Sequence, residues 1–174
     1  SIIMIIFLLL LNHYKQKMSL FSLKNKSILI TGSSKGIGKS IAYQSALMGA
    51  NVIISSRKID ACEDTAKVIN DDVGKEVAFP IACNIADADQ LKNLVDKTIQ
   101  TLGGIDSLIC NAATNTFMGS MLDMDIEQFD KVMHNNIRSN QLLCNLCLPN
   151  MIKKGDGSII IISSIAAIKG SAFL

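Results

Sequence analysis

The chain alternates between short apolar runs and longer stretches with helical periodicity. Four of the runs, at 27–31, 51–56, 106–111 and 158–164, are apolar almost throughout. Unbroken apolar character over this length is typical of parallel strands that helices cover on both faces. We therefore predict strands at these four places and expect all of them to be buried.

Another strand is expected within 76–84, with its interior made irregular by Pro80. Helices are predicted between the strands, at 36–48, 60–73, from Asp87 to Leu102 and within 125–153. The first helix is expected to carry Ile37, Ile41, Ser45 and Met48 on one face. Asp87 should cap the third helix, with Gln90 as its capping-box partner.

This alternation predicts an α/β fold of the doubly wound Rossmann type, with a parallel sheet and helices on both faces. The 174 residues suffice for one domain. The domain is expected to span 18–174. It would be incomplete, because the C-terminal part of a full dinucleotide fold, including its sixth strand, is missing.

The first segment does not fit this pattern. Ten consecutive apolar residues, 2–11, are too few for a spanning helix, which needs about 20. A signal peptide would carry a basic stretch and a small-residue cleavage site, and neither is present. We expect 1–17 to be a leader outside the fold and the protein to be cytoplasmic. The alternative is a membrane anchor that the printed sequence cuts short.

The composition limits which binding partners and which cellular compartment we expect. With 17 basic and 15 acidic side chains, a net charge of +2 and no basic run, nucleic acid is not an expected partner. Five cysteines without framework spacing favour a reducing compartment. Cys144 and Cys147 form a C-x-x-C inside an apolar helical stretch, so we expect core residues there and no metal site.

A glycine-rich loop, "TGSSKGIG" at 31–38, joins the first strand to the first helix. Gly32 permits a tight turn, Gly36 lets the backbone approach a pyrophosphate, and Gly38 lets the helix pack closely on the strand. The helix N-terminus would then offer free N–H groups to the phosphates. Because a strand precedes the motif and a helix follows it, the context supports dinucleotide binding.

The second strand ends in "SSRK", where an NAD site usually carries an acidic residue. Arg57 and Lys58 there, together with Lys35 in the glycine loop, would bind a 2′-phosphate by charge-assisted hydrogen bonds. The sequence therefore favours NADP(H). Polar residues also end the other strands, so one crevice is expected to gather Thr31, Ser55, Ser56, Asn84, Asn111, Ser163 and Ser164.

From Phe21 to its end, the chain resembles the classical short-chain dehydrogenase/reductase family. The likeness is closest to the NADPH-dependent carbonyl reductases that end their second strand in "SSRK". The matching segments are "TGSSKGIG", "SSRK", "CNAAT" at 110–114, "NNIRS" at 135–139 and "GSIIIISSIAA" at 157–167.

The resemblance implies roles for individual residues. Asn136 would be the catalytic asparagine that holds a water, selected over Asn135 by the family register. Ser164 would bind the substrate carbonyl oxygen, and Asn111 would stabilise the sheet and border the cofactor. The cofactor set implied is Gly32, Ser34, Lys35, Gly36, Ile37, Gly38, Arg57, Lys58, Asn84, Ile85, Asn111, Ala112, Ala113 and Ser163.

Three departures from the family pattern stand out. Asn84 replaces an aspartate, and Ala113 replaces a glycine, which should tighten that turn. The family's Tyr-x-x-x-Lys does not occur, since neither Tyr14 nor Tyr43 is followed by lysine at that spacing. The residues present are the serine, the asparagine and the cofactor loop, without the acid that would protonate the alkoxide.

The resulting hypothesis is an NADPH-dependent oxidoreductase that moves hydride between the nicotinamide and a small carbonyl or alcohol. The chain would be an N-terminal fragment, inactive by itself, of a protein that forms a homo-oligomer. One alternative is a catalytically dead dinucleotide-binding sensor or partner protein. A nucleotide-sugar epimerase fits less well, because its usual glycine spacing differs from "GSSKGIG". His134 is expected on a helix surface, without a chemical role.

Overall fold

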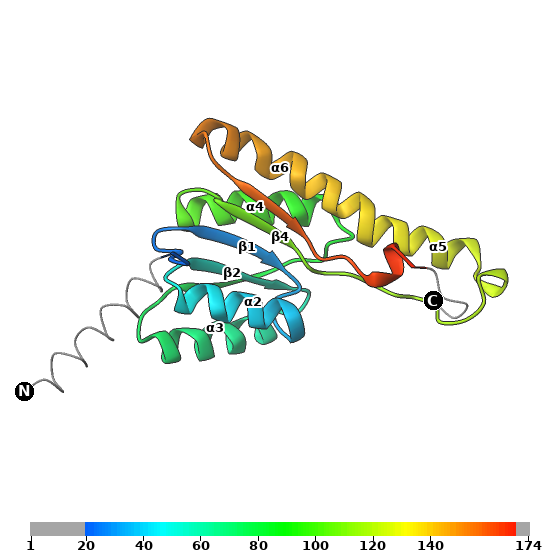
Figure 1. Ribbon diagram of the computed structural model, residues 1–174, viewed down its shortest axis with the longest axis horizontal. Helices are drawn as coiled ribbons and strands as arrows, with labels where there is room; N and C mark the ends of the chain where they lie inside the picture. Colours follow the sequence, from blue (N-terminus) through cyan, green and yellow to red (C-terminus); the bar gives the residue numbers. More distant parts are fainter. Residues whose placement is uncertain (1–19, 170–174) are drawn as a thin grey trace, which may run out of the picture.

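The computed structural model describes residues 20–169, so the predicted leader at 1–17 lies outside the described residues. Within them, five strands form one parallel sheet in the order β3-β2-β1-β4-β5. The strands are β1 (Ser27–Thr31), β2 (Asn51–Ser56), β3 (Ala78–Ala82), β4 (Ser107–Cys110) and β5 (Ser158–Ile161). The predicted doubly wound α/β fold is confirmed (Figure 1).

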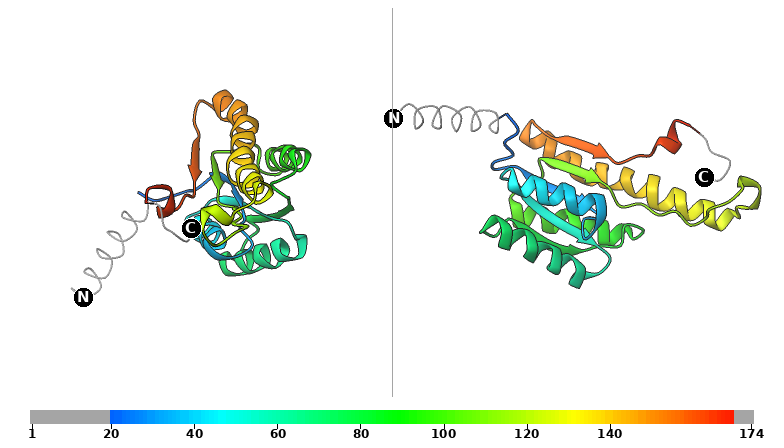
Figure 2. Two further views of the ribbon diagram at one scale, coloured as in Figure 1. Left: turned by 90° about the vertical axis from the view of Figure 1, so that its right-hand side faces the viewer. Right: turned by 60° about the horizontal axis from the view of Figure 1, so that its bottom comes forward.

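Helices cover both faces of the sheet, as Figures 1 and 2 show. The α-helices are α2 (Gly36–Leu47), α3 (Ile59–Val73), α4 (Ala88–Leu102), α5 (Ile126–Met133) and α6 (Ser139–Lys154). Short helical turns occur at η1 (Met121–Asp123), η2 (His134–Arg138) and η3 (Ile165–Ala167). Among the described residues, no helix has the length and apolar character needed to cross a bilayer.

The core consists of two layers, one on each side of the sheet. Side chains alternate along β1, so Ile28 and Ile30 lie in the layer under α2 and α3, while Leu29 lies in the layer under α4 and α6. All three are almost completely buried. The nearly continuous apolar character of β1 follows from this burial on both faces.

The face predicted for α2 is buried only in part, at Ser45 and Ile41. The buried residues of α2 are small, namely Gly38, Ala42, Ser45 and Ala46, whereas Ile37 is 64% exposed. Small side chains let the helix backbone approach the sheet closely, and the larger apolar residues of this helix are left at its margins.

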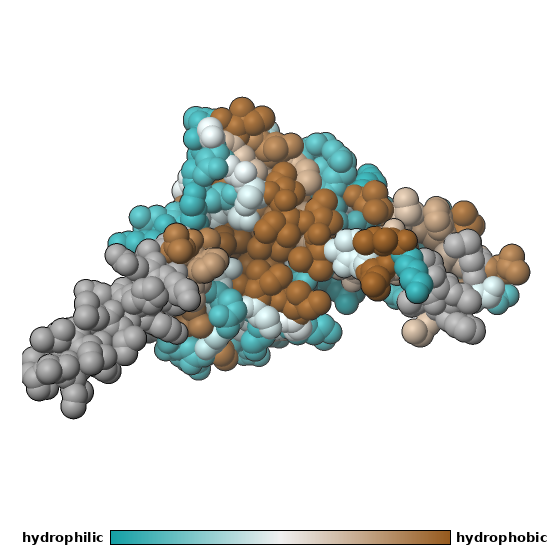
Figure 3. Space-filling view, viewed as in Figure 1, coloured by the Kyte–Doolittle hydropathy of each residue, from teal (hydrophilic) through white to brown (hydrophobic). Residues whose placement is uncertain are grey.

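The prediction that the fifth strand is buried is also wrong. β5 is an edge strand of the described sheet, and Ile160 and Ile161 are 47% and 54% exposed. Only the neighbouring Ile159 and Ile162 pack against the two core layers. Hydrophobic surface gathers over the middle of the face that Figure 3 displays, where β5 and α2 lie in Figure 1.

Pro80 does not disturb its strand, contrary to the prediction, and it pairs in register with Ile54. The N–H of Cys83 donates to Ser56 O at 2.8 Å, so alternate residues of β3 bond to β2 and Pro80 faces the free edge. The Asp87 cap is confirmed, since its Oδ1 accepts from the N–H of Gln90 at 3.0 Å. The Gln90 amide, however, bonds the Asp87 carboxylate and the Asn84 N–H instead of closing a capping box.

A buried carboxylate ties the strands together at the amino end of the sheet. Asp106 accepts a hydrogen bond from the Ser27 N–H at 2.7 Å and ion-pairs with Lys154, and Lys26 lies 3.9 Å away. Burial alone would raise the pKa of Asp106. The hydrogen bonds from Lys154 and Ser27 and the two positive charges outweigh it and hold the pKa below its ordinary value.

Replacing Asp106 with asparagine should therefore lower the free energy of unfolding at pH 7 by about 1–3 kcal/mol, the usual range for hydrogen bonds to a charged group. Because the folded-state pKa is depressed, the carboxylate stabilises the fold above its unfolded pKa of about 4. This contribution is lost as pH falls through the folded pKa. Urea titrations at pH 7 and pH 3 would measure both effects.

The control is Asp156→Asn, because Asp156 pairs with Lys26 at 3.0 Å but is exposed, and solvent weakens such pairs. Its effect on stability should be much smaller than that of Asp106→Asn. Equal losses for the two variants, or a loss at Asp106 that does not shrink at low pH, would contradict the role assigned to the buried carboxylate.

Candidate functional site

The sheet has a topological switch point between its two central strands. β1 and β4 are neighbours, but the chain leaves β1 toward β2 and β3 and leaves β4 toward β5. The loops that follow β1 and β4 therefore diverge, and ligands of open α/β sheets bind in the crevice that this creates. The glycine loop, 32–35, and the segment 111–114 both lie at this point.

Two glycines of the loop have backbones that favour glycine, with φ +66° at Gly32 and +58° at Gly36. A Cβ at Gly32 would also lie 2.9 Å from Ala112 Cα. A Cβ at Gly38 would lie 2.5 Å from both Gly32 O and Asn111 Nδ2, which confirms that this glycine permits close packing. A Cβ at Gly36 would meet nothing within 4 Å, so space is open beside it.

Hydrogen bonds hold the glycine loop in shape. Ser33 is fully buried, and its Oγ donates to Ile30 O at 2.7 Å and accepts from the Ser55 N–H at 2.8 Å. Thr65 on α3 donates to Ser34 O at 3.0 Å. The sequence analysis missed Ser33 and Thr65. A small polar residue inside a glycine loop was a signal for Ser33, whereas Thr65 depends on a contact 31 positions away.

Asn111 joins the end of β4 to the glycine loop. Its Nδ2 donates to Thr31 O at 2.9 Å and to Gly32 O at 3.1 Å. The N–H groups of Asn111 and Ala112 both donate to Thr31 Oγ1 at 3.1 Å. Asn111 thus stabilises the sheet at the switch point, as the resemblance implied.

Ala113 does not adopt the left-handed backbone that favours glycine, and the tightening of its turn stays a prediction. Among the described residues, Asn25 is the one non-glycine residue with a left-handed backbone. The glycine that usually stands at this position is therefore not needed for its conformation here.

The cations predicted at the end of β2 are available to a ligand. Arg57 and Lys58 are exposed, as is Lys35 in the glycine loop. In the part of the chain that the structure describes, every ion pair involves Lys26 or Lys154, so these three cations have no acidic partner there. No side chain among the same residues caps α2, which leaves the N–H groups of its first turn open to an anion.

The next strand end contributes Asn84 and Ile85. Asn84 is exposed, and its Oδ1 accepts from the N–H of Ala86 at 3.2 Å, which shapes the turn after β3. Because an amide oxygen has two lone pairs, it retains capacity for a second donor.

Asn136 lies in the π-helical turn η2, between α5 and α6. Its Oδ1 accepts from the Thr114 N–H at 2.8 Å, and its Nδ2 donates to Thr114 O at 2.7 Å. The side chain therefore clamps the segment that follows β4. π-turns inside α-helices occur frequently at functional sites. The 3.6-residue periodicity used in the sequence analysis gives no sign of such a turn.

His134 is not the free surface residue that was predicted. It is half-buried, and its Nε2 lies 2.9 Å from Ala86 O. Because a carbonyl oxygen only accepts, Nε2 carries the hydrogen. Arg138 Nη1 lies close to both ring nitrogens, 3.1 Å from Nδ1 and 3.3 Å from Nε2. This contact joins the π-turn to the loop after β3.

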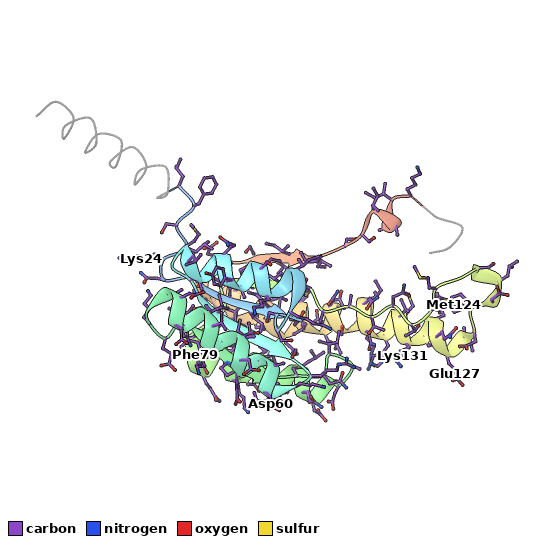
Figure 4. The ribbon with its side chains drawn as sticks, turned by 90° about the horizontal axis from the view of Figure 1, so that it is seen from below. Lys24, Asp60, Phe79, Met124, Glu127 and Lys131 are labelled. Carbon is purple, nitrogen blue, oxygen red and sulfur yellow. The ribbon has the colours of Figure 1, made fainter. Side chains whose placement is uncertain are left out.

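The two serines follow β5, at the edge of the sheet. Both are exposed, and Ser164 Oγ accepts from the Ala166 N–H at 3.1 Å, capping η3. In Figure 4, η3 stands apart from α5, which carries Glu127 and Lys131. Ser164 and Asn136 are not joined by a hydrogen bond within 20–169. Asn136 instead bonds Thr114, in the segment whose first residues, Asn111 and Ala112, bond the end of β1 and the glycine loop.

The prediction that the C-x-x-C holds core residues is confirmed for Cys147. Cys110 and Cys147 are almost fully buried, and burial raises the pKa of each thiol to about 12. Burial likewise raises the pKa of Cys83 to about 11. Cys144 differs because it is only half-buried. All five cysteines are free thiols.

A parallel doubly wound sheet with a glycine loop and a helix N-terminus at its switch point is the arrangement of the dinucleotide-binding fold. The family described as short chain dehydrogenase matches residues 26–174. The chain therefore belongs to the short-chain dehydrogenase/reductase family, whose members use NAD(P)(H) on small molecules.

Curated relatives support this membership. The chain is 37% identical over 145 residues to dehydrogenase/reductase SDR family member 4 of Sus scrofa, covering 83% of this chain and 51% of the relative. It is 38% identical over 149 residues to the Homo sapiens protein of the same name, covering 86% and 53%. The chain thus spans about half the length of the curated relatives it matches.

Solved structures of dehydrogenases are also similar to this chain. A short-chain type dehydrogenase/reductase from Mycobacterium marinum superposes with a TM-score of 0.82 at 35% identity, covering 88% of this chain and 62% of that one. A 7α-hydroxysteroid dehydrogenase complexed with NADH and 7-oxo glycochenodeoxycholic acid gives 0.81 at 34% identity, covering 87% and 58%.

Asn111→Asp tests the hydrogen bonds that join the end of β4 to Thr31 and Gly32 at the switch point. The change replaces Nδ2 with a carboxylate oxygen that faces Thr31 O and Gly32 O, so we expect unfolding to become easier by more than about 2 kcal/mol at pH 7. The introduced carboxyl should titrate above its ordinary pKa, so the loss should shrink as pH falls. Asn115→Asp, at an exposed position in the same loop, is the matched control. Equal losses for the two would contradict the role of these hydrogen bonds.

Thiol labelling tests the burial of the cysteines. At pH 8, iodoacetamide should modify Cys144 first in the folded chain, because thiols with pKa values of about 11 and 12 hold less than about one part in a thousand as thiolate. In denaturant all five should react. Rapid modification of Cys110 or Cys147 in the folded chain would contradict the structure.

Proposed function

We propose that this chain binds NADP(H) at the carboxyl edge of its sheet and supplies the cofactor-binding part of a carbonyl or alcohol oxidoreductase. The proposal rests on two exposed cations, Arg57 and Lys58, which have no acidic partner within 20–169 and lie at the strand end next to the open glycine loop. A ribose 2′-phosphate supplies the negative charge that these cations lack.

The residues present fit a dinucleotide from one end to the other. The pyrophosphate would lie on the N–H groups at the start of α2, against Gly36, where no atom blocks its approach. Ser34, Lys35, Ile37 and Gly38 would line the same loop. The adenine would lie between Arg57 and the turn at Asn84 and Ile85, and the nicotinamide half would border Asn111, Ala112, Ala113 and Ser163.

The bound nicotinamide would supply the hydride donor or acceptor. This chain's own residues would position the carbonyl, with Ser164 donating a hydrogen bond to its oxygen and Asn136 holding a water nearby. Ser164 Oγ already accepts from Ala166 N, so its own hydrogen remains to be donated. The 174 residues contain no Tyr-x-x-x-Lys, so we propose cofactor binding without turnover for the printed chain.

Further proposals concern the whole protein. Its substrate would be a small carbonyl or alcohol, and its compartment the cytoplasm, which suits five free thiols. We also expect the whole protein to form a homo-oligomer.

Arg57→Ala tests the cofactor preference. The variant should bind NADPH at least about tenfold more weakly, the effect of losing a charge-assisted hydrogen bond, while NADH binding changes little. Titration calorimetry or NADPH fluorescence on the 174-residue chain would measure both affinities. Lys67→Ala, which removes an exposed cation from α3, is the control and should bind both cofactors as the parent does.

Equal affinity of the parent chain for NADPH and NADH would contradict the preference, and absence of binding by either would contradict the site. The same preparations would be assayed for carbonyl reduction. Measurable turnover would contradict the proposed lack of an acid.

A further inference from the structure

The π-turn η2 contacts two loops that leave different strands. One is the turn after β3, at 84–86, and the other is the segment after β4, at 111–114. In the proposed function the first would hold the adenine and the second would border the nicotinamide. Figures 1 and 4 show the helical run of α5 and α6 passing along this end of the sheet.

The contact with the first loop is made by one side chain. His134 donates from Nε2 to Ala86 O at 2.9 Å, and the Ala86 N–H is itself held by Asn84 Oδ1 at 3.2 Å. Arg138 Nη1 lies 3.1 Å from Nδ1 and 3.3 Å from Nε2, so the guanidinium packs against the imidazole near both nitrogens. The bond to Ala86 O requires the tautomer with the hydrogen on Nε2.

The contact with the second loop lies two residues further along the same turn. Asn136 makes two hydrogen bonds to Thr114, of 2.8 and 2.7 Å. Its backbone carbonyl accepts from Asn140 Nδ2 at 2.8 Å, which ties the turn to α6. Hydrogen bonds therefore join His134 to the turn at Asn84 and Asn136 to Thr114, and the backbone of the π-turn links His134 to Asn136.

We propose that His134 is a positioning residue that couples the adenine side of the site to Asn136. This inference rests on the proposed NADP(H) site, since it assigns the two loops to the two halves of that cofactor. Binding of the adenine half would fix the turn at 84–86. The bond to His134 would then hold the π-turn and, through Asn136, the Thr114 backbone.

Amide hydrogen exchange of Thr114, followed by NMR on the 174-residue chain, tests the coupling. Without ligand, His134→Ala should exchange the Thr114 N–H about fivefold faster, the effect of losing one ordinary hydrogen bond. His134→Gln should restore the parent rate, because its amide can donate to Ala86 O. Gln141→Ala, which removes a bond within α6 to Asn145 Oδ1 at 3.0 Å, is the control and should not change the rate.

The second arm adds adenosine 2′,5′-bisphosphate, which carries only the adenine half. It should slow exchange at Thr114 in the parent and in His134→Gln, but not in His134→Ala. Parent-like behaviour of His134→Ala in both arms, or failure of glutamine to rescue, would overturn the inference. If the probe does not bind, the proposed cofactor site fails, and the ligand-free comparison still decides whether His134 holds Asn136.

Discussion

The close approach of α2 to the ends of β1 and β4 constrains the whole carboxyl edge. At Gly38 there is no room for a methyl group, since it would lie 2.5 Å from both Gly32 O and Asn111 Nδ2. The helix α2, the glycine loop and the end of β4 must therefore pack in one fixed arrangement. That packing directs the first turn of α2 at the crevice and brings Asn111 within reach of two carbonyl oxygens of the loop after β1. A looser contact would leave those carbonyls unpaired.

The two ends of the sheet use charge in opposite ways. At the amino end, Asp106 is buried and its partners are supplied by the chain itself, from Ser27, Lys26 and Lys154. At the carboxyl end, Arg57 and Lys58 are exposed and have no acidic partner among the described residues. A buried carboxylate whose partners all come from the chain suits a structural role. Exposed cations at a strand end, without an acidic partner among the described residues, suit the binding of an anionic ligand.

The sequence predicted the strands and the glycine loop well because both depend on local pattern. The bounds of β1 and β2 agree with their apolar runs, since strands buried on both faces leave a continuous apolar record. An apolar run does not show where its strand lies in the sheet, so the sequence could not predict the exposure of Ile160 on the edge strand β5. The apolar face predicted for α2 is buried only in part, because close packing at Gly38 selects small residues over large apolar ones.

The functional residues also divide into those that a local motif reveals and those that depend on contacts between distant segments. The glycines and the "SSRK" segment were visible as motifs, whereas Ser33, Thr65 and His134 acquire their roles only through contacts between distant segments. His134 in particular depends on a π-turn that helical periodicity does not reveal.

The pairing of the two central strands, β1 and β4, also affects how the protein folds. β1 and β4 lie side by side, yet the bond from Ser27 to Asp106 that ties them joins residues 79 positions apart. Such distant parallel pairing forms slowly, because the loop between the strands must be closed before any contact stabilises it. Two βαβ halves can each collapse locally beforehand. The switch point belongs to neither half alone, so we expect the loops of the proposed cofactor site to come together in the same step in which the two halves pair.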